Sequence, residues 1–144
     1  MRMDQDIPPV RRLMTLRIIW AALLMGQLAF LGIVLMIGPN QPAPDPQMLR
    51  ILLYVLIAMA ATMIPIGFVI RGIIYNNGRT EAGVAPAQYA VGNILFWAMC
   101  EGVGLFGITA GLLNRGRGPH LIVAVIALAI MIVSFPTGGV MRRD

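Results

Sequence analysis

Residues 89–113 read YAVGNILFWAMCEGVGLFGITAGLL, an apolar run interrupted by a single carboxylate, Glu101. A helix needs about 20 apolar residues to cross the roughly 30 Å of hydrocarbon in a bilayer. The run is long enough, and its glycines and alanines are typical of helices that pack closely inside membranes. This stretch therefore predicts a membrane-spanning helix. Glu101, near its middle, is the first candidate for a functional residue because charged groups are costly at that depth.

Three further apolar runs accompany it, at residues 16–38, 50–70 and 120–135. The last run is short for a span, so it either continues through Pro136 toward Met141 or lies where the bilayer thins. The connections between runs are short and polar, and none of them resembles a domain boundary. We therefore expect one all-α membrane domain over residues 1–144. Its four transmembrane helices form an up-down bundle, preceded by a polar cytoplasmic segment at residues 1–15.

The composition points to lipid as the solvent. The chain is 58% hydrophobic and 12% charged, whereas soluble domains carry about 25% charged residues. The net charge is +5 and every basic residue is an arginine. These arginines flank the apolar runs, so they indicate membrane topology rather than nucleic-acid binding. The expected partner is the lipid bilayer, and no nucleic acid is expected.

The arginines also predict an orientation. If the N-terminus is cytoplasmic, three arginines lie outside, and all the others lie inside. The outer ones are Arg50, Arg115 and Arg117; the inner ones are Arg2, Arg11, Arg12, Arg17, Arg71, Arg79, Arg142 and Arg143. Cytoplasmic loops carry the excess of basic residues, so both termini are expected in the cytoplasm of a cell with an inner membrane. Tyr75 and Tyr89 then fit an aromatic belt at the inner interface, whereas Trp97 lies too deep for one.

Glu101 has few candidate partners within the chain. An acid at mid-membrane is neutral, paired or facing water, because an ionised carboxylate in contact with lipid is costly. No arginine lies deep in any run, which argues against a buried salt bridge. Gln27 in the first run and Thr62 in the second are available to bond with it, as is a backbone carbonyl freed by Pro65. Glu101, Gln27 and Thr62 are therefore the candidate ion-binding residues.

A stripe of small or polar residues runs beside Glu101. At 100° per residue, its members fall on one side of the helix: Asn93, Cys100, Gly104, Gly107 and Gly111. Gly107 and Gly111 form a GxxxG pair, a pattern that lets two membrane helices approach closely. This helix-packing stripe is expected to contact another helix of the chain, a second copy of it or another membrane subunit.

Two functions remain open, and enzymes are largely excluded. Glu101 either binds or conducts H⁺ or Na⁺, or the chain is a non-catalytic scaffold or accessory subunit that assembles through its glycine-rich stripe. Without lysine the chain has no P-loop and no Schiff base. One histidine and one cysteine on different segments predict no catalytic pair, no cofactor and no metal site. His120, at the start of the fourth run, is expected at the membrane interface.

Residues 98–113, AMCEGVGLFGITAGLL, resemble the acid-bearing second helix of the proteolipid c subunit of rotary ATP synthases. In that family a Glu or Asp at mid-membrane, among small residues, binds the translocated proton or sodium ion. The resemblance implies the same role for Glu101. Residues 50–70 lack the glycine-rich stripe of the partner helix in that family, so the resemblance does not imply a ring. The whole chain resembles small four-helix membrane proteins of bacteria, and that likeness implies a fold without a function.

Overall fold

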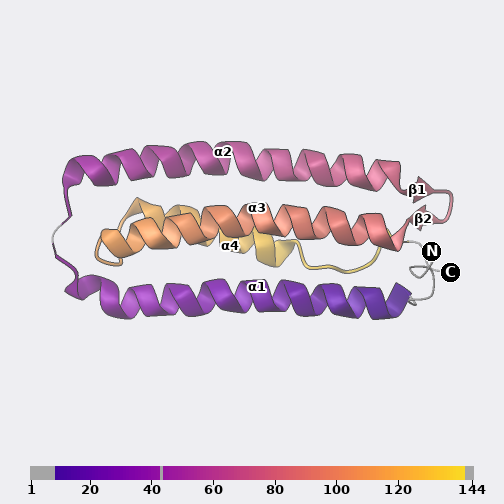
Figure 1. Cartoon of the computed structure of the whole chain (residues 1–144), viewed down its shortest axis with the longest axis horizontal. Helices are drawn as coiled ribbons and strands as arrows, with labels where there is room; N and C mark the ends of the chain where they lie inside the picture. Colours follow the sequence, from indigo (N-terminus) through magenta and orange to yellow (C-terminus); the bar gives the residue numbers. More distant parts are fainter. Residues whose placement is uncertain (1–8, 43, 142–144) are drawn as a thin grey trace, which may run out of the picture.

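The computed structural model describes residues 9–42 and 44–141, and this part of the chain is mostly helical (Figure 1). It holds four α-helices: α1 (Pro9–Ile37), α2 (Pro46–Asn77), α3 (Pro86–Leu113) and α4 (Pro119–Val133). The helices α1, α2 and α3 are long and apolar enough to cross a membrane, and α4 is a shorter apolar helix. The all-helical membrane fold expected from the sequence is confirmed to that extent. Arg2, Arg142 and Arg143 lie outside the described residues, as does the start of the N-terminal segment predicted at 1–15.

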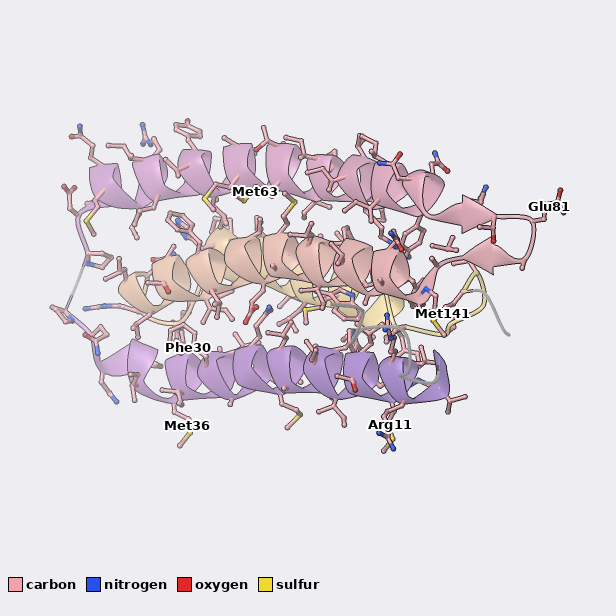
Figure 2. All side chains as sticks on the ribbon, turned by 45° about the vertical axis from the view of Figure 1, so that its right-hand side comes forward. Arg11, Phe30, Met36, Met63, Glu81 and Met141 are labelled. Carbon is pink, nitrogen blue, oxygen red and sulfur yellow. The ribbon has the colours of Figure 1, made fainter. Side chains whose placement is uncertain are left out.

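The helix α3 is the centre of the bundle. Successive helices run in opposite directions, with α3 between α1 and α2 and with α4 alongside it (Figure 1). Half of the apolar window of α3 is buried, against 11% in each of α1 and α2. On α1, Arg11 and Met36 point away from the bundle, whereas Phe30 points toward α3 (Figure 2). The outer faces of α1 and α2 therefore suit lipid.

The helices extend beyond the apolar runs that predict them. Prolines begin α2, α3 and α4, which suits a position where the backbone N–H would have no helical partner. The side chain of Asp45 also caps α2, because its Oδ1 accepts a hydrogen bond of 2.9 Å from the Gln47 N–H. Asn76 and Asn77, which lie beyond the apolar run at 50–70, are the last residues of α2. Because helical hydrogen bonds continue beyond the hydrocarbon, the length of an apolar run underestimates the length of its helix.

A short hairpin that the sequence did not predict connects α2 and α3. Its strands, β1 (Arg79–Thr80) and β2 (Gly83–Val84), pair antiparallel, and Glu81 lies at its tip (Figure 2). The Val84 N–H donates to the Val140 carbonyl at 2.9 Å, and Val84 forms a parallel bridge with Met141. The last described residue therefore lies at the same end of the bundle as the hairpin.

The fourth apolar run ends differently from the prediction. The 15 residues of α4 give a length of about 22 Å, and the chain then continues through Pro136 to Met141 without helix. Non-helical backbone at membrane depth needs partners for its polar groups. Three side chains supply them: Trp20 Nε1 donates to the Met131 carbonyl at 2.9 Å, Trp97 Nε1 to that of Ser134 at 3.3 Å, and Arg17 Nε to that of Pro136 at 3.3 Å. Trp97, which is too deep for an aromatic belt, lies where its indole can donate to the Ser134 carbonyl.

Glycines on α3 let α4 come close. A Cβ added at Gly107 would lie 2.9 Å from the Ala124 Cβ and 3.0 Å from the His120 carbonyl oxygen. A Cβ at Gly111 would overlap the side chain of Leu121. The GxxxG pair of the sequence is therefore covered by α4 of the same chain.

Gly107→Ala should separate α3 from α4, because the new methyl group meets α4 backbone that cannot move independently of its helix. We expect the free energy of unfolding in detergent to fall by about 1–3 kcal/mol. Gly102→Ala is the matched control, since nothing lies within 4 Å of its added Cβ. Equal stability of the two variants would contradict the close packing of α3 and α4.

Trp97→Phe should leave the Ser134 carbonyl without its indole donor. An unpaired carbonyl that is shielded from water costs about 1–3 kcal/mol, so thermal unfolding should begin at a lower temperature than in the wild type. Tyr54→Phe, on the exposed face of α2, serves as the control. A Trp97→Phe protein as stable as this control would show that the Ser134 carbonyl has another donor.

Candidate functional site

Glu101 lies on α3 in the middle of the bundle. The contacts of α2 with α3 give the height of Glu101 along the bundle. Gly67 of α2 packs against Phe96 and Met99 of α3, and Glu101 lies just beyond Met99, level with the central part of the apolar run of α2. The side chain is half-buried. Within residues 9–42 and 44–141 it forms no hydrogen bond and no ion pair. The bundle thus holds an unpaired acid at membrane depth.

Gln27 lies on α1 and is buried at the contact with α3. Its side chain is 1% exposed. The amide nitrogen Nε2 lies 3.7 Å from Met131 Sδ on α4, a weak hydrogen bond, and the amide oxygen Oε1 has no partner among the described residues. A Cβ added at Gly104 would lie 2.7 Å from this oxygen. Gly104 therefore makes room for the Gln27 amide where α1 meets α3.

The Gln27 amide lies close to the position of Glu101. Gly104 follows Glu101 by one helical turn, and residues three apart on a helix have Cβ positions about 5–6 Å apart. The Cβ of Glu101 therefore lies about 5–6 Å from the point on α3 that the Gln27 oxygen contacts, and no hydrogen bond joins the two side chains in this structure. A neutral carboxyl has one O–H to donate, and the amide oxygen is an acceptor. A bare carboxylate and this oxygen would instead supply two ligands of the type that hard cations prefer.

The non-helical end of the fourth run lies next to the same amide. Gln27 contacts Met131, whose carbonyl accepts the hydrogen bond from Trp20 two residues before α4 ends. In transporters, helices that are interrupted within the membrane place unpaired carbonyls and helix ends near ion sites. Gln27 therefore contacts α3 at Gly104 and α4 at Met131.

The predicted helix-packing stripe faces three other elements of the chain. Cys100 is buried in the core, and Gly104 contacts α1, while Gly107 and Gly111 contact α4. Asn93 is 1% exposed and donates from Nδ2 to the Tyr75 hydroxyl at 2.6 Å and to the Tyr89 carbonyl at 2.8 Å. Asn93 thus lies two turns from Glu101 in a separate polar cluster with α2.

The structure does not bring Thr62 to Glu101. Thr62 lies on the exposed side of α2, and its hydroxyl donates to carbonyls of its own helix, those of Ala58 at 2.8 Å and Met59 at 3.3 Å. Pro65, whose freed carbonyl was another candidate, is also on the exposed side. Of the other two residues predicted to bind an ion, only Gln27 contacts α3 near Glu101, at Gly104 on the next helical turn; we refer to Glu101 and Gln27 as the Glu101–Gln27 pair.

His120 and Tyr89, both expected at a membrane interface, are buried within the bundle. His120 is 2% exposed, with Nε2 at 3.0 Å from the Leu49 carbonyl and Nδ1 without a partner among the described residues. Tyr89 is 3% exposed, and its hydroxyl accepts a hydrogen bond of 3.1 Å from the Gly138 N–H. Both side chains bond with backbone groups inside the bundle, and their depth in the membrane stays a prediction. In the described part of the chain, no cluster of three metal-ligating side chains occurs.

Sequence reasoning missed one cluster completely. It contains Arg71 and Tyr75 of α2, and Tyr89 and Asn93 of α3, at the hairpin end of the bundle. From the sequence, Tyr75 and Tyr89 were expected in an aromatic belt and not in contact with each other. The signal that could have revealed the cluster is that two tyrosines, an asparagine and an arginine lie at the same height on neighbouring antiparallel helices.

Compared with protein-family models, curated proteins and solved structures, the chain matches none.

In a Glu101→Ala background, where no carboxyl can donate to the Gln27 oxygen, Gln27→Leu should not destabilise the bundle, because it replaces a buried and unpaired amide oxygen by an apolar group of similar size. Asn93→Leu is the comparison: it removes two hydrogen bonds, and we expect a loss of about 1–3 kcal/mol in the free energy of unfolding. Chemical unfolding in detergent measures both. A loss of the same size in Gln27→Leu would show that the Gln27 amide is paired within the folded chain.

Proposed function

We propose that this chain is a small polytopic protein of a cell inner membrane in which the Glu101–Gln27 pair binds H⁺ or Na⁺. The observation that carries the proposal is the buried Gln27 oxygen, which lacks a donor and lies against Gly104, one helical turn along α3 from Glu101. An intramembrane acid is by default a functional candidate. Here it also has a neighbour that can accept a hydrogen bond from the neutral acid or share a cation with the carboxylate.

The pair suits a binding site with two states. In the neutral state Glu101 holds the proton and donates a hydrogen bond to the Gln27 oxygen. When the proton leaves, a negative charge remains at membrane depth, and a sodium ion between the two oxygens compensates it. The same two oxygens therefore serve H⁺ and Na⁺, and the relative concentrations of the two ions decide which one is bound.

The proposed topology places four spans in the membrane with both ends of the chain in the cytoplasm. The fourth span consists of α4 and the non-helical segment that continues to Met141. Arg11, Arg17, Arg71 and Arg79 lie toward the end of the bundle where α1 begins and the hairpin lies, and the positive-inside rule assigns that end to the cytoplasm. The opposite end carries Arg50, Arg115 and Arg117. The resemblance of residues 98–113 to the proteolipid c subunit supports the same role for the acid.

The alternative function, a scaffold or accessory subunit that assembles through the glycine stripe, has less support. The buried contacts of Gly104, Gly107 and Gly111 are made with α1 and α4 of the same chain. A second copy or another membrane subunit would need a different surface. The mass of the purified protein in mild detergent tests this alternative directly, because a stable homo-oligomer or a co-purifying subunit would favour it.

Glu101→Gln should abolish ion binding without unfolding the protein, since glutamine keeps the size of the side chain and cannot exchange a proton. We expect the wild type in proteoliposomes to move H⁺ or Na⁺ and to react with a carbodiimide at Glu101. Sodium ions should block the reaction at a sodium site, and alkaline pH should block it at a proton site. The variant should show neither movement nor labelling.

Glu81→Gln is the matched control, because Glu81 is an exposed acid at the tip of the hairpin and its loss should leave both measurements unchanged. Ion movement and labelling at wild-type levels in Glu101→Gln would overturn the proposal. A wild type that shows neither, while remaining folded, would overturn it as well and direct attention to the scaffold alternative.

A further inference from the structure

A second polar cluster lies between α2 and α3, about three helical turns along α3 from the contact of Gln27 with Gly104. The guanidinium carbon of Arg71 lies 5.3 Å from the centroid of the Tyr75 ring and 5.5 Å from that of Phe96. Both distances are typical of cation–π contacts. Arg71 also forms a side-chain hydrogen bond with Tyr75. A guanidinium carries five N–H donors, so further N–H groups of Arg71 remain for a ligand.

The remaining contacts fix Tyr75 in place. Its ring stacks on that of Tyr89, with centroids 5.5 Å apart and an interplanar angle of 20°. A Cβ added at Gly92 would lie 2.8 Å from the Tyr75 ring, so only glycine leaves it this room. The Tyr75 oxygen accepts the hydrogen bond of 2.6 Å from Asn93. Because the oxygen is the acceptor there, the hydroxyl proton of Tyr75 is available to an acceptor outside the protein.

The charge of Arg71 is not balanced within the described chain. Three carboxylates belong to residues 9–42 and 44–141: Asp45, Glu81 and Glu101. None of them forms an ion pair with Arg71. A half-buried cation at the edge of an apolar helix therefore has only aromatic rings and a hydroxyl as neighbours. The ligand that this arrangement lacks is an anion with several acceptor oxygens.

The depth of Arg71 identifies the source of that anion. The apolar run of α2 begins at Ile51 and ends at Ile70, which is about 30 Å of helix at 1.5 Å per residue. This length equals the hydrocarbon thickness of a typical bilayer. Arg71 is the next residue, so its guanidinium reaches the layer of lipid phosphates on the hairpin side. A groove between membrane helices with basic side chains at this level suits an anionic headgroup.

We propose that Arg71 and Tyr75 bind the phosphate group of an anionic phospholipid in the leaflet on the hairpin side. The guanidinium edge donates two parallel hydrogen bonds to phosphate oxygens, and the Tyr75 hydroxyl donates a third. A zwitterionic lipid fits less well because its headgroup brings an ammonium group into the neighbourhood of Arg71 and Arg79. This site stands independently of the Glu101–Gln27 pair.

The test compares lipids that differ only in the headgroup. The full chain, purified in mild detergent, is titrated with phosphatidylglycerol or phosphatidylcholine of identical acyl chains, and bound lipid is measured by native mass spectrometry. We expect the wild type to bind phosphatidylglycerol about tenfold more tightly, which is the effect of one charge-assisted hydrogen bond. Arg71→Gln should lose this preference. Arg71→Lys should keep only part of it, because an ammonium cannot form the paired hydrogen bonds.

Arg79→Gln is the matched control, since Arg79 is an exposed arginine at the same end of the bundle and its loss should leave the preference intact. Tyr75→Phe keeps the ring under the guanidinium and should weaken phosphatidylglycerol binding several-fold. If Arg71→Gln fails to fold, Arg71→Lys and Tyr75→Phe carry the test. A wild-type preference in both of these variants would overturn the proposal.

Two further outcomes would also overturn it. A loss of preference in Arg79→Gln as large as in Arg71→Gln would show a diffuse attraction to basic charge rather than a site. Displacement of phosphatidylglycerol by an equal concentration of inorganic phosphate would show a site for a soluble anion. Glu101→Gln should bind the lipid as the wild type does, so failure of the ion-site proposal leaves this one standing.

Discussion

The close approach of α1, α2 and α4 to α3 is the constraint on which the rest of the structure depends. Lipid tails are as apolar as leucine, so helices in a membrane associate through close packing and hydrogen bonds instead of the hydrophobic effect. Glycines on α3 face each neighbour in turn: Gly92 faces Tyr75 of α2, Gly104 faces Gln27 of α1, and Gly107 faces Ala124 of α4. Since α3 is the helix that every neighbour covers, the contacts that can hold buried polar groups are formed on it.

The second constraint is the backbone of the fourth run. Where α4 ends, its carbonyls have no helical N–H groups, and lipid offers no water to replace them. Two indoles, from Trp20 of α1 and Trp97 of α3, and the side chain of Arg17 supply the missing donors. The interrupted span is therefore stable only while α1 and α3 remain together. The packing of α3 with α1 thus holds both the Glu101–Gln27 pair and the end of α4.

The sequence predicts the number and order of the helices because hydrocarbon thickness sets the length of an apolar run. It does not predict where helices end, since helical hydrogen bonds extend past the lipid in α1 and α2. The end of α4 was also out of reach: residues 120–135 are almost uniformly apolar, and the side chains that bond its carbonyls come from helices distant in sequence. The hairpin at β1 and β2 rests partly on contacts with Val140 and Met141, which no local pattern reveals.

A helical wheel shows which residues of one helix share a face, and only that part of the candidate site could be predicted from the sequence. The wheel places Gly104 one turn from Glu101. Because a small residue lets a second helix approach closely, Gly104 indicates that another helix packs there. It cannot give the rotation of a second helix about its own axis. In α2 that rotation is set by the buried Leu56 and Gly67, which direct Thr62 outward, whereas in α1 the buried Leu16 and Val34 place Gln27 inside.

The position of α3 between the two polar clusters limits how they can influence each other. The Glu101–Gln27 pair lies where α3 meets α1, and the cluster of Arg71 and Tyr75 lies where α3 meets α2. If both proposed ligands bind, coupling between them has two routes: α3, which both clusters contact, and α4, which contacts α1 through Trp20 and Met131 and α2 through His120 and Leu49. Because α4 packs against α3 through glycines, a small rotation of α3 would also displace the interrupted span.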